Sequence, residues 1–216
     1  LSALIQSGVF FRKQDTAERR SLFMPVNRSV PDVAQKRKDW NGLISGFSAS
    51  DLVFLDKSGC NIDMTRRYAY SLGGSRAVDS TPLSKPKNTT ILSSIQLNGT
   101  LYYKTFSGGT TVERFKQFLE TDLLPHLNGN SVLVMDNMKS HHAKAVKELL
   151  DSSRVRYIYL PPHSPDLNPI EKLWSKVKAF LRKFKARTLD DIPNAIQHAF
   201  QRDHPNNCVN LRRGVK

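Results

Sequence analysis

Ser-Val-Leu-Val-Met-Asp, at residues 131–136, is the stretch that decides the fold of this 216-residue chain. An unbroken apolar run of this length is typical of a strand that is covered on both faces of a sheet. Leu-Val-Phe-Leu-Asp at residues 52–56 repeats the pattern. If these two strands are parallel neighbours, Asp56 and Asp136 emerge at the same carboxyl edge of the sheet. The two stretches therefore predict an α/β domain with a pair of carboxylates at that edge.

The surrounding segments predict a mixed five-stranded sheet flanked by helices. Asn98-Gly99 is a strong hairpin signal between two strand-like segments. With the two runs above, the predicted strands are residues 52–55, 89–97, 100–106, 131–135 and 156–160. A further candidate strand lies at residues 68–78. Apolar residues at helical spacing predict helices over residues 111–124, 141–150, 169–185 and 189–202.

Residues 1–49 are basic and poorly periodic, unlike the rest of the chain. We interpret them as a connector with one or two short helices, the clearer of which begins at Pro31 or Asp32 and carries Val33 and Trp40. Its charges suit either a solvated face or contact with phosphate. The predicted organisation is a connector at 1–49, an α/β domain at 50–204 and a C-terminal tail at 205–216.

The composition excludes several classes of protein and favours a polyanionic partner. The 33 Lys and Arg against 19 Asp and Glu give a formal net charge of +14, which attracts nucleic acid. Two distant cysteines, Cys60 and Cys208, support neither a disulfide framework nor a structural zinc site. No apolar run approaches the roughly 18 residues of a membrane helix. We therefore expect a cytoplasmic protein that uses no membrane.

A third acid, Glu171, falls in the first turn of the predicted helix at 169–185. Carboxylates brought close together repel one another unless a cation neutralises them. Hard oxygen ligands favour Mg²⁺, with Mn²⁺ as a substitute. Three ionised acids around one small site call for about two such ions.

Each of these acids also has a purely structural explanation. An aspartate at the end of a strand is commonly a turn former or a helix cap. Asn168-Pro169-Ile170-Glu171 fits a helix N-cap, a first-turn proline and a capping-box acid. Asp63 and Asp166 are rival carboxylates, of which Asp63 lacks a buried strand before it and Asp166 fits a turn. The combination of three acids at equivalent ends of elements favours the site.

The spacing and the local strings are more specific still. Asp136 and Glu171 are separated by 34 residues, and Glu171 ends the string Leu-Pro-Pro-His-Ser-Pro-Asp-Leu-Asn-Pro-Ile-Glu at residues 160–171, with Trp174 after it. Further strings are Arg-Arg-Tyr at 66–68, Gly-Gly at 73–74 and Lys-Asn-Thr-Thr at 87–90. Together they resemble the catalytic core of DDE transposases of the Tc/mariner superfamily, in particular the bacterial insertion-sequence branch. The resemblance covers about residues 33–200 and does not include the paired helix-turn-helix region of that family. It implies that residues 50–204 are the catalytic domain and that residues 1–49 are the connector from a missing N-terminal DNA-binding region.

This resemblance implies a ribonuclease-H-like fold in which Asp56, Asp136 and Glu171 form a catalytic triad that binds two metal ions. It implies hydrolytic cleavage of DNA at transposon ends, then strand transfer into target DNA at a TA dinucleotide, by a homodimer in the nucleoid of a bacterium. Two alternatives remain: a metal-dependent nuclease of the same fold, or a catalytically silent DNA-binding remnant. Lys57 and His163 depart from the family pattern, which usually has an acid and often an aromatic residue there.

The remaining candidates surround this triad. Asn137, His141 and Asn168 are predicted to lie at the edge of the site, and for His141 a contact at a helix N-terminus is an equal alternative. Trp174 is predicted to belong to the core. The basic residues that we assign to DNA contact, with a solvated helix face as the alternative for the three lysines, are Lys172, Lys176, Lys183, Arg66 and Arg67.

Overall fold

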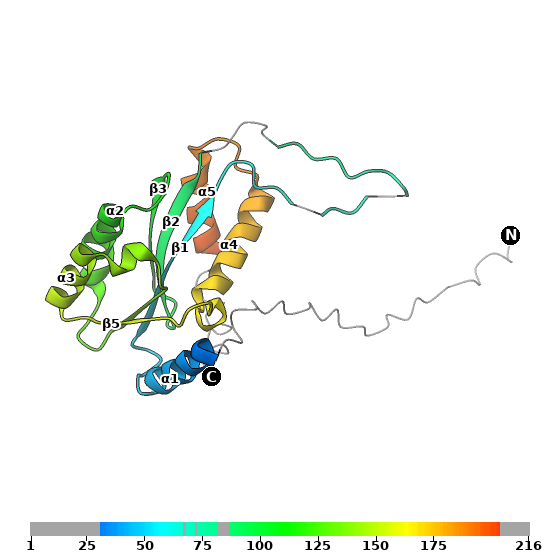
Figure 1. The fold of residues 1–216 in the computed structure, drawn as a ribbon. Helices are drawn as coiled ribbons and strands as arrows, with labels where there is room; N and C mark the ends of the chain where they lie inside the picture. Colours follow the sequence, from blue (N-terminus) through cyan, green and yellow to red (C-terminus); the bar gives the residue numbers. More distant parts are fainter. Residues whose placement is uncertain (1–30, 67, 72, 82–86, 204–216) are drawn as a thin grey trace, which may run out of the picture.

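The computed structural model describes residues 31–66, 68–71, 73–81 and 87–203 (Figure 1). At its centre lies a mixed sheet with the strand order β3-β2-β1-β4-β5, which confirms the predicted five strands. Strand β1 pairs in parallel with β4 and antiparallel with β2, while β4 and β5 are parallel and β2 and β3 antiparallel. The strands are β1 (Leu52–Cys60), β2 (Thr89–Gln96), β3 (Leu101–Ser107), β4 (Val132–Met135) and β5 (Arg156–Tyr159).

Helices cover both faces of this sheet (Figure 1). Helices α4 and α5 lie on one face, and α2 and α3 lie on the other. The helices are α1 (Pro31–Ser45), α2 (Val112–Gln117), α3 (Lys144–Ser153), α4 (Ile170–Phe184) and α5 (Asp191–Asp203). The helix predicted over 111–124 is present but changes form, because α2 continues as a π-helical segment, η2 (Phe118–Leu123), and a 3-10 turn, η3 (Leu124–His126).

The core is divided by the sheet into two apolar clusters. Alternate residues of a strand point to opposite faces, so Phe54 packs with Trp174 and Phe200 on one side, while Leu55 packs with Phe115 on the other. This double burial is why β1 and β4 have unbroken apolar runs. It also holds the carboxyl ends of both strands in fixed positions.

The hairpin between β2 and β3 turns at Asn98-Gly99, as predicted. Gly99 has φ of 95°, a left-handed conformation that glycine adopts without steric cost, and the Asn98 side chain accepts a hydrogen bond from the Thr100 amide at 2.8 Å. The candidate strand at 68–78 is wrong, since its described residues form no strand. Both edges of β1 are already paired, and Tyr68 and Tyr70 are fully or almost fully exposed.

Helix α1 confirms the helix predicted in the connector, with Val33 and Trp40 both buried. Residues 1–30 and 204–216 lie outside the described residues, so the predicted limits of the connector and of the tail stay predictions. Within the described part of the chain, no helix is both long enough and apolar enough to cross a membrane.

Candidate active site

Asp56 lies inside β1 at the level where β4 ends. Leu55 pairs with Met135, the last residue of β4. Asp56 and Asp136, the residues that come directly after this pair, therefore lie at the same level of two parallel strands. This confirms the prediction that the strands ahead of Asp56 and Asp136 are parallel neighbours. The expectation that Asp56 comes after its strand is wrong, because β1 continues to Cys60 by pairing with β2. The Asp56 side chain points to the α4 face and is 7% exposed.

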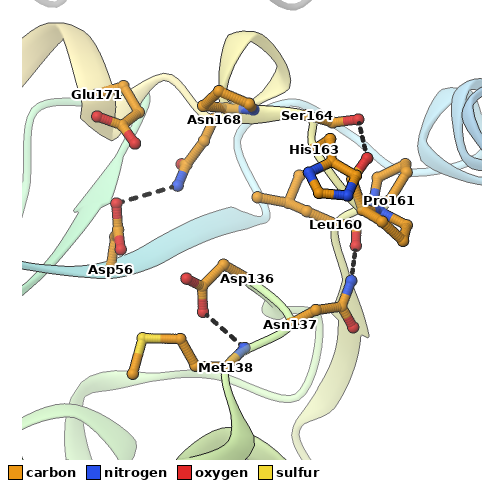
Figure 2. Close-up of a pocket in the computed structure, with 12 residues that line it drawn as sticks. Asp56, Asp136, Asn137, Met138, Leu160, Pro161, His163, Ser164, Asn168 and Glu171 are labelled. Atoms are coloured by element: carbon orange, nitrogen blue, oxygen red, sulfur yellow. Dashed lines mark hydrogen bonds between the residues drawn. The ribbon is translucent and has the colours of Figure 1, made fainter. Parts of the chain in front are cut away.

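Three donors from the chain hold the Asp56 carboxylate. The Lys57 amide donates to Oδ1 at 2.7 Å, and the indole Nε1 of Trp174 donates to Oδ2 at 3.2 Å. The side-chain amide of Asn168 donates to Oδ2 at 3.4 Å (Figure 2). Burial raises the pKa of Asp56 to about 7 despite these bonds, and the nearby charges of Asp136 and Glu171 add to the rise.

Asp136 is held by His141, whose side chain is 1% exposed. The His141 Nδ1 lies 2.8 Å from Oδ1 of Asp136 and 3.1 Å from its backbone oxygen. Both of these oxygens can only accept, so Nδ1 must carry the proton. Although burial raises the pKa of Asp136, the hydrogen bond and charge of His141, together with the Met138 amide and the Lys57 charge, leave the pKa lowered. His141 thus contacts Asp136 from outside the lining of the cavity described below.

Glu171 comes from the first turn of α4, on the far side of the cavity from Asp136 (Figure 2). The Asn168 backbone oxygen accepts from the Glu171 amide at 3.2 Å, but the Asn168 side chain turns to Asp56 and makes no cap. The capping-box alternative is therefore wrong. Burial raises the pKa of Glu171, the Lys178 amine opposes this rise, and the charge of Asp136 adds to it.

The three carboxylates line one cavity of about 310 Å³. Its other walls are the segment after β4 and the proline-rich loop before α4 (Figure 2). These walls include Asn137, whose side-chain amide donates to the Leu160 backbone oxygen. In the described part of the chain no three His, Cys, Asp or Glu side chains are placed to hold one metal ion together. In Figure 2 the Asp56 side chain is drawn between those of Glu171 and Asp136.

The two rival carboxylates do not line this cavity. Asp63 is exposed beyond the end of β1, and Asp166 forms an ion pair with Arg37 at 2.9 Å. Of the two departures from the family pattern, His163 lines the cavity. The Lys57 side chain lies on the opposite face of β1 from Asp56, where its charge helps to lower the pKa of Asp136.

Four of the basic residues assigned to DNA are described by the structure, and none of these four lines the cavity. Lys172, Lys183 and Arg66 are exposed and Lys176 is partly buried, while Arg67 lies outside the described residues. Sequence reasoning missed Lys178, whose charge acts on Glu171. Its spacing of seven residues from Glu171, which places both on one helix face, could have identified it. It also missed the second role of Trp174, which is both a core residue and a donor to Asp56.

Comparison with known proteins agrees with this geometry. The family model described as DDE superfamily endonuclease matches residues 51–193, about two thirds of the chain. The Tcb2 transposase of Caenorhabditis briggsae is 34% identical over 70 residues, which are 32% of this chain and 26% of that protein. The present chain thus spans only part of this relative.

Solved structures of the Mos1 transposase share the fold. Its paired-end complex with the left transposon end has a TM-score of 0.71 at 20% identity, over 86% of this chain and 59% of that one. The isolated catalytic domain of the Mos1 mariner transposase has a TM-score of 0.62 at 17% identity, over 85% of each chain. These neighbours confirm the ribonuclease-H-like fold. With three acids on the predicted elements around one cavity and a family match over residues 51–193, the chain belongs to the DDE superfamily endonucleases.

Proposed function

We propose that this chain is the catalytic domain of a DNA transposase of the Tc/mariner type, which hydrolyses phosphodiester bonds at transposon ends and then joins the freed ends to target DNA. The observation that carries the proposal is the meeting of Asp56, Asp136 and Glu171 around one cavity. The string at residues 160–171 supports the narrower placement in the bacterial insertion-sequence branch.

The cavity fits divalent cations. Burial raises the pKa of Asp56, and the charges of Asp136 and Glu171 add to the rise, so a cation bound between these acids would favour their ionised forms. The Asn168 Oδ1 atom is buried beside Asp56 with no hydrogen-bond partner in the described structure, so one more hard oxygen is present. Related complexes of the Mos1 transposase were solved with Mg and with Mn. Carboxylate oxygens are the ligands that these metals prefer.

Two ions are proposed, one held by Asp56 and Asp136 and the other by Asp56 and Glu171. In this proposal each ion is held by a pair of these carboxylates, and Asp56 is shared by both. When bound, such ions activate a water molecule or a DNA 3′-hydroxyl and neutralise the charge that develops on the leaving oxygen.

The contribution of the protein is to position the carboxylates and, at Asp136, to favour the ionised form. Trp174 and Asn168 hold one oxygen of Asp56 from the α4 side. His141 fixes Asp136 and lowers its pKa, so that this carboxylate is ionised before any metal arrives. Because His141 is buried and stacks on the Phe115 ring at 4.3 Å, its own orientation is fixed as well.

DNA is the proposed partner. The net charge of +14 and the lysines Lys172, Lys176 and Lys183 on α4, joined by Arg66 and Arg67, supply cations for phosphate contact. The Mos1 neighbours include a paired-end complex with transposon-end DNA and a strand transfer complex. Assembly as a homodimer on DNA and action at the bacterial nucleoid in the cytoplasm are parts of this proposal.

A strand-transfer assay tests the proposal. The chain is incubated with Mg²⁺, a target plasmid and a pre-cleaved duplex taken from inverted repeats that flank the coding region. Transposase function predicts joined products at TA sites that Glu171→Gln abolishes. Cleavage without joining would support the nuclease instead, and DNA binding that is sensitive to salt but indifferent to Mg²⁺ would support the silent remnant.

A further inference from the structure

Arg37 on α1 grips the loop that leads into Glu171. Its Nη1 donates to the Ser164 hydroxyl at 2.6 Å and to Oδ1 of Asp166 at 3.2 Å, while Nη2 donates to Oδ2 of Asp166 at 2.9 Å. A guanidinium that binds both oxygens of a carboxylate fixes orientation as well as distance. The Arg37 side chain is 18% exposed, so water only partly screens these bonds.

Helix α1 holds Arg37 in place from the other side. Val33, Arg37 and Trp40 are four and three residues apart, so they share one face of the helix. Val33 and Trp40 are both buried, and Trp40 belongs to the core cluster that contains Phe54 of β1. Arg37 is therefore presented to the loop from a helix that is packed against the catalytic domain.

The loop itself needs such support. His163 has φ of 54°, a left-handed conformation that residues with a Cβ rarely adopt. The next residue, Ser164, donates its hydroxyl to the Pro162 oxygen at 3.0 Å and accepts from Arg37. Ser164 is buried, and its backbone oxygen accepts from the Leu167 amide at 3.1 Å. The Arg37 contact thus falls on the residue that closes the strained turn.

From Ser164 a continuous chain of bonds reaches the catalytic acids. After the 3-10 turn η5 (Pro165–Leu167), the Asn168 amide donates to the Pro165 oxygen at 3.0 Å, and the Glu171 amide donates to the Asn168 oxygen at 3.2 Å. The Asn168 side chain then contacts Asp56. A shift of Ser164 would consequently move both Asn168 and Glu171 relative to the strands.

We propose that Arg37 is a positioning residue, which ties α1 to the loop at 161–169 and so keeps Asn168 and Glu171 in register with Asp56. Its effect on catalysis rests on the proposed function, whereas its effect on the loop does not. Helix α1 lies outside residues 51–193, the family match, so the connector supplies part of the framework of the active site. The connector charges were expected either to be solvated or to contact phosphate. Arg37 does neither in this structure, because it binds Ser164 and Asp166.

A matched pair of variants tests the catalytic effect. Arg37→Ala and Lys38→Ala each remove one positive charge from α1, but Lys38 is exposed. In single-turnover cleavage at saturating DNA, Arg37→Ala is expected to be about 10- to 100-fold slower, as for a displaced catalytic group. Lys38→Ala is expected to match the wild type. The cleavage rate of Arg37→Lys, which cannot bind both Asp166 oxygens, should fall between the rates of these two variants. The DNA concentration that gives half saturation should change little in all three variants.

A double-mutant cycle tests the contact itself. If Arg37 and Asp166 act together, the double variant Arg37→Ala/Asp166→Ala is expected to be no slower than Arg37→Ala alone. Rate losses that multiply would show that the two residues act independently and would overturn the proposal.

Amide hydrogen exchange gives a readout that requires no DNA. The amides of Leu167, Asn168 and Glu171 are expected to exchange faster in Arg37→Ala than in Lys38→Ala, while those of β4 stay unchanged. Equal exchange in the two variants would overturn the inference, and with an active wild type it would leave the proposed function standing. If Arg37→Ala fails to fold, Arg37→Lys and Asp166→Asn carry the same comparison. If the wild type cleaves no DNA, the exchange result alone decides.

Discussion

The indole Nε1 of Trp174 and the carboxylate of Asp56 are joined by a 3.2 Å hydrogen bond between α4 and β1. Trp174 is 2% exposed and packs with Phe54 in the core on the α4 face. The bond therefore ties the placement of Asp56, the central acid of the proposed triad, to the packing of a helix whose first turn carries Glu171. Trp174→Phe keeps most of this packing but removes the donor.

For Trp174→Phe we expect a folded protein with a pKa of Asp56 above that of the wild type, because a bond that lowers this pKa is removed. The pKa rises because the indole donates its hydrogen bond to the ionised form of the Asp56 carboxyl, and the variant lacks this stabilisation. The pH at which single-turnover cleavage reaches half its maximum should move to a higher value. A slower reaction with an unchanged pH profile would show that Trp174 acts through packing alone.

Asp56→Asn is expected to remove activity and to stabilise the fold above neutral pH. The folded pKa of Asp56, about 7, lies above its ordinary value of 3.8. The folded state then binds more protons between these values, so the free energy of unfolding of the wild type falls as pH rises from about 4 to about 7. At ~1.4 kcal/mol for each pKa unit, the loss is at most ~4 kcal/mol.

Thermal melting at pH 5 and pH 8 in chelator measures this effect. The melting temperature of Asp56→Asn relative to the wild type should be higher at pH 8 than at pH 5. Added Mg²⁺ should raise the melting temperature of the wild type at pH 8 and leave that of the variant almost unchanged. Parallel pH dependence of the two proteins would refute the assignment of a buried carboxylate with a raised pKa to Asp56.

Lys57→Met is expected to reduce the Mg²⁺ concentration needed for half-maximal cleavage. The Lys57 charge helps to lower the pKa of Asp136, so it acts on the carboxylate that the proposed ion would also bind. Removal of this like-charge repulsion should lower the requirement by about 3- to 10-fold, because the pair is partly screened by solvent. Lys57→Arg, which keeps the charge, is the control. An unchanged or higher Mg²⁺ requirement in Lys57→Met would contradict this view of Lys57.

The three lysines of α4 are predicted to contact DNA phosphates. Changing Lys172, Lys176 and Lys183 together to Ala should reduce the slope of log affinity against log salt by about 2 to 3, or ~0.9 for each phosphate that is no longer neutralised. Lys144→Ala, at a position on α3 that is 90% exposed, serves as a control and should leave the slope unchanged. An unaltered slope in the triple variant would assign these lysines to solvation of the helix.

The sheet and its carboxyl edge could be predicted because buried parallel strands leave continuous apolar runs that are visible in the sequence itself. The extension of β1 from Asp56 to Cys60 could not be predicted in this way. That segment contains Lys57, Ser58 and Gly59, and it is held as a strand by pairing with β2, such as Cys60 with Thr89. The local sequence does not show which strand will pair with such a segment.

The site shows the same division between local and distant information. The triad was proposed from spacing and local strings, but the bonds of Asn168 and Trp174 to Asp56 span 112 and 118 residues. The Arg37–Asp166 pair spans 129 residues. Asn168 carried a good capping signal, yet its side chain is used by Asp56. The capping pattern is chemically reasonable, but in the structure the Asn168 side chain binds Asp56 on the distant strand β1 in place of the helix N-terminus.

The central claim is that Asp56, Asp136 and Glu171 hold the metals that drive phosphodiester cleavage. Its most direct test is Mn²⁺-dependent cleavage of a pre-nicked transposon-end duplex by the wild type and by Asp136→Asn, with folding of both checked by thermal melting. The wild type should cleave only with the metal, and Asp136→Asn should be at least about 100-fold slower, as for removal of a group that stabilises the transition state. Cleavage by Asp136→Asn at the rate of the wild type would contradict the assignment.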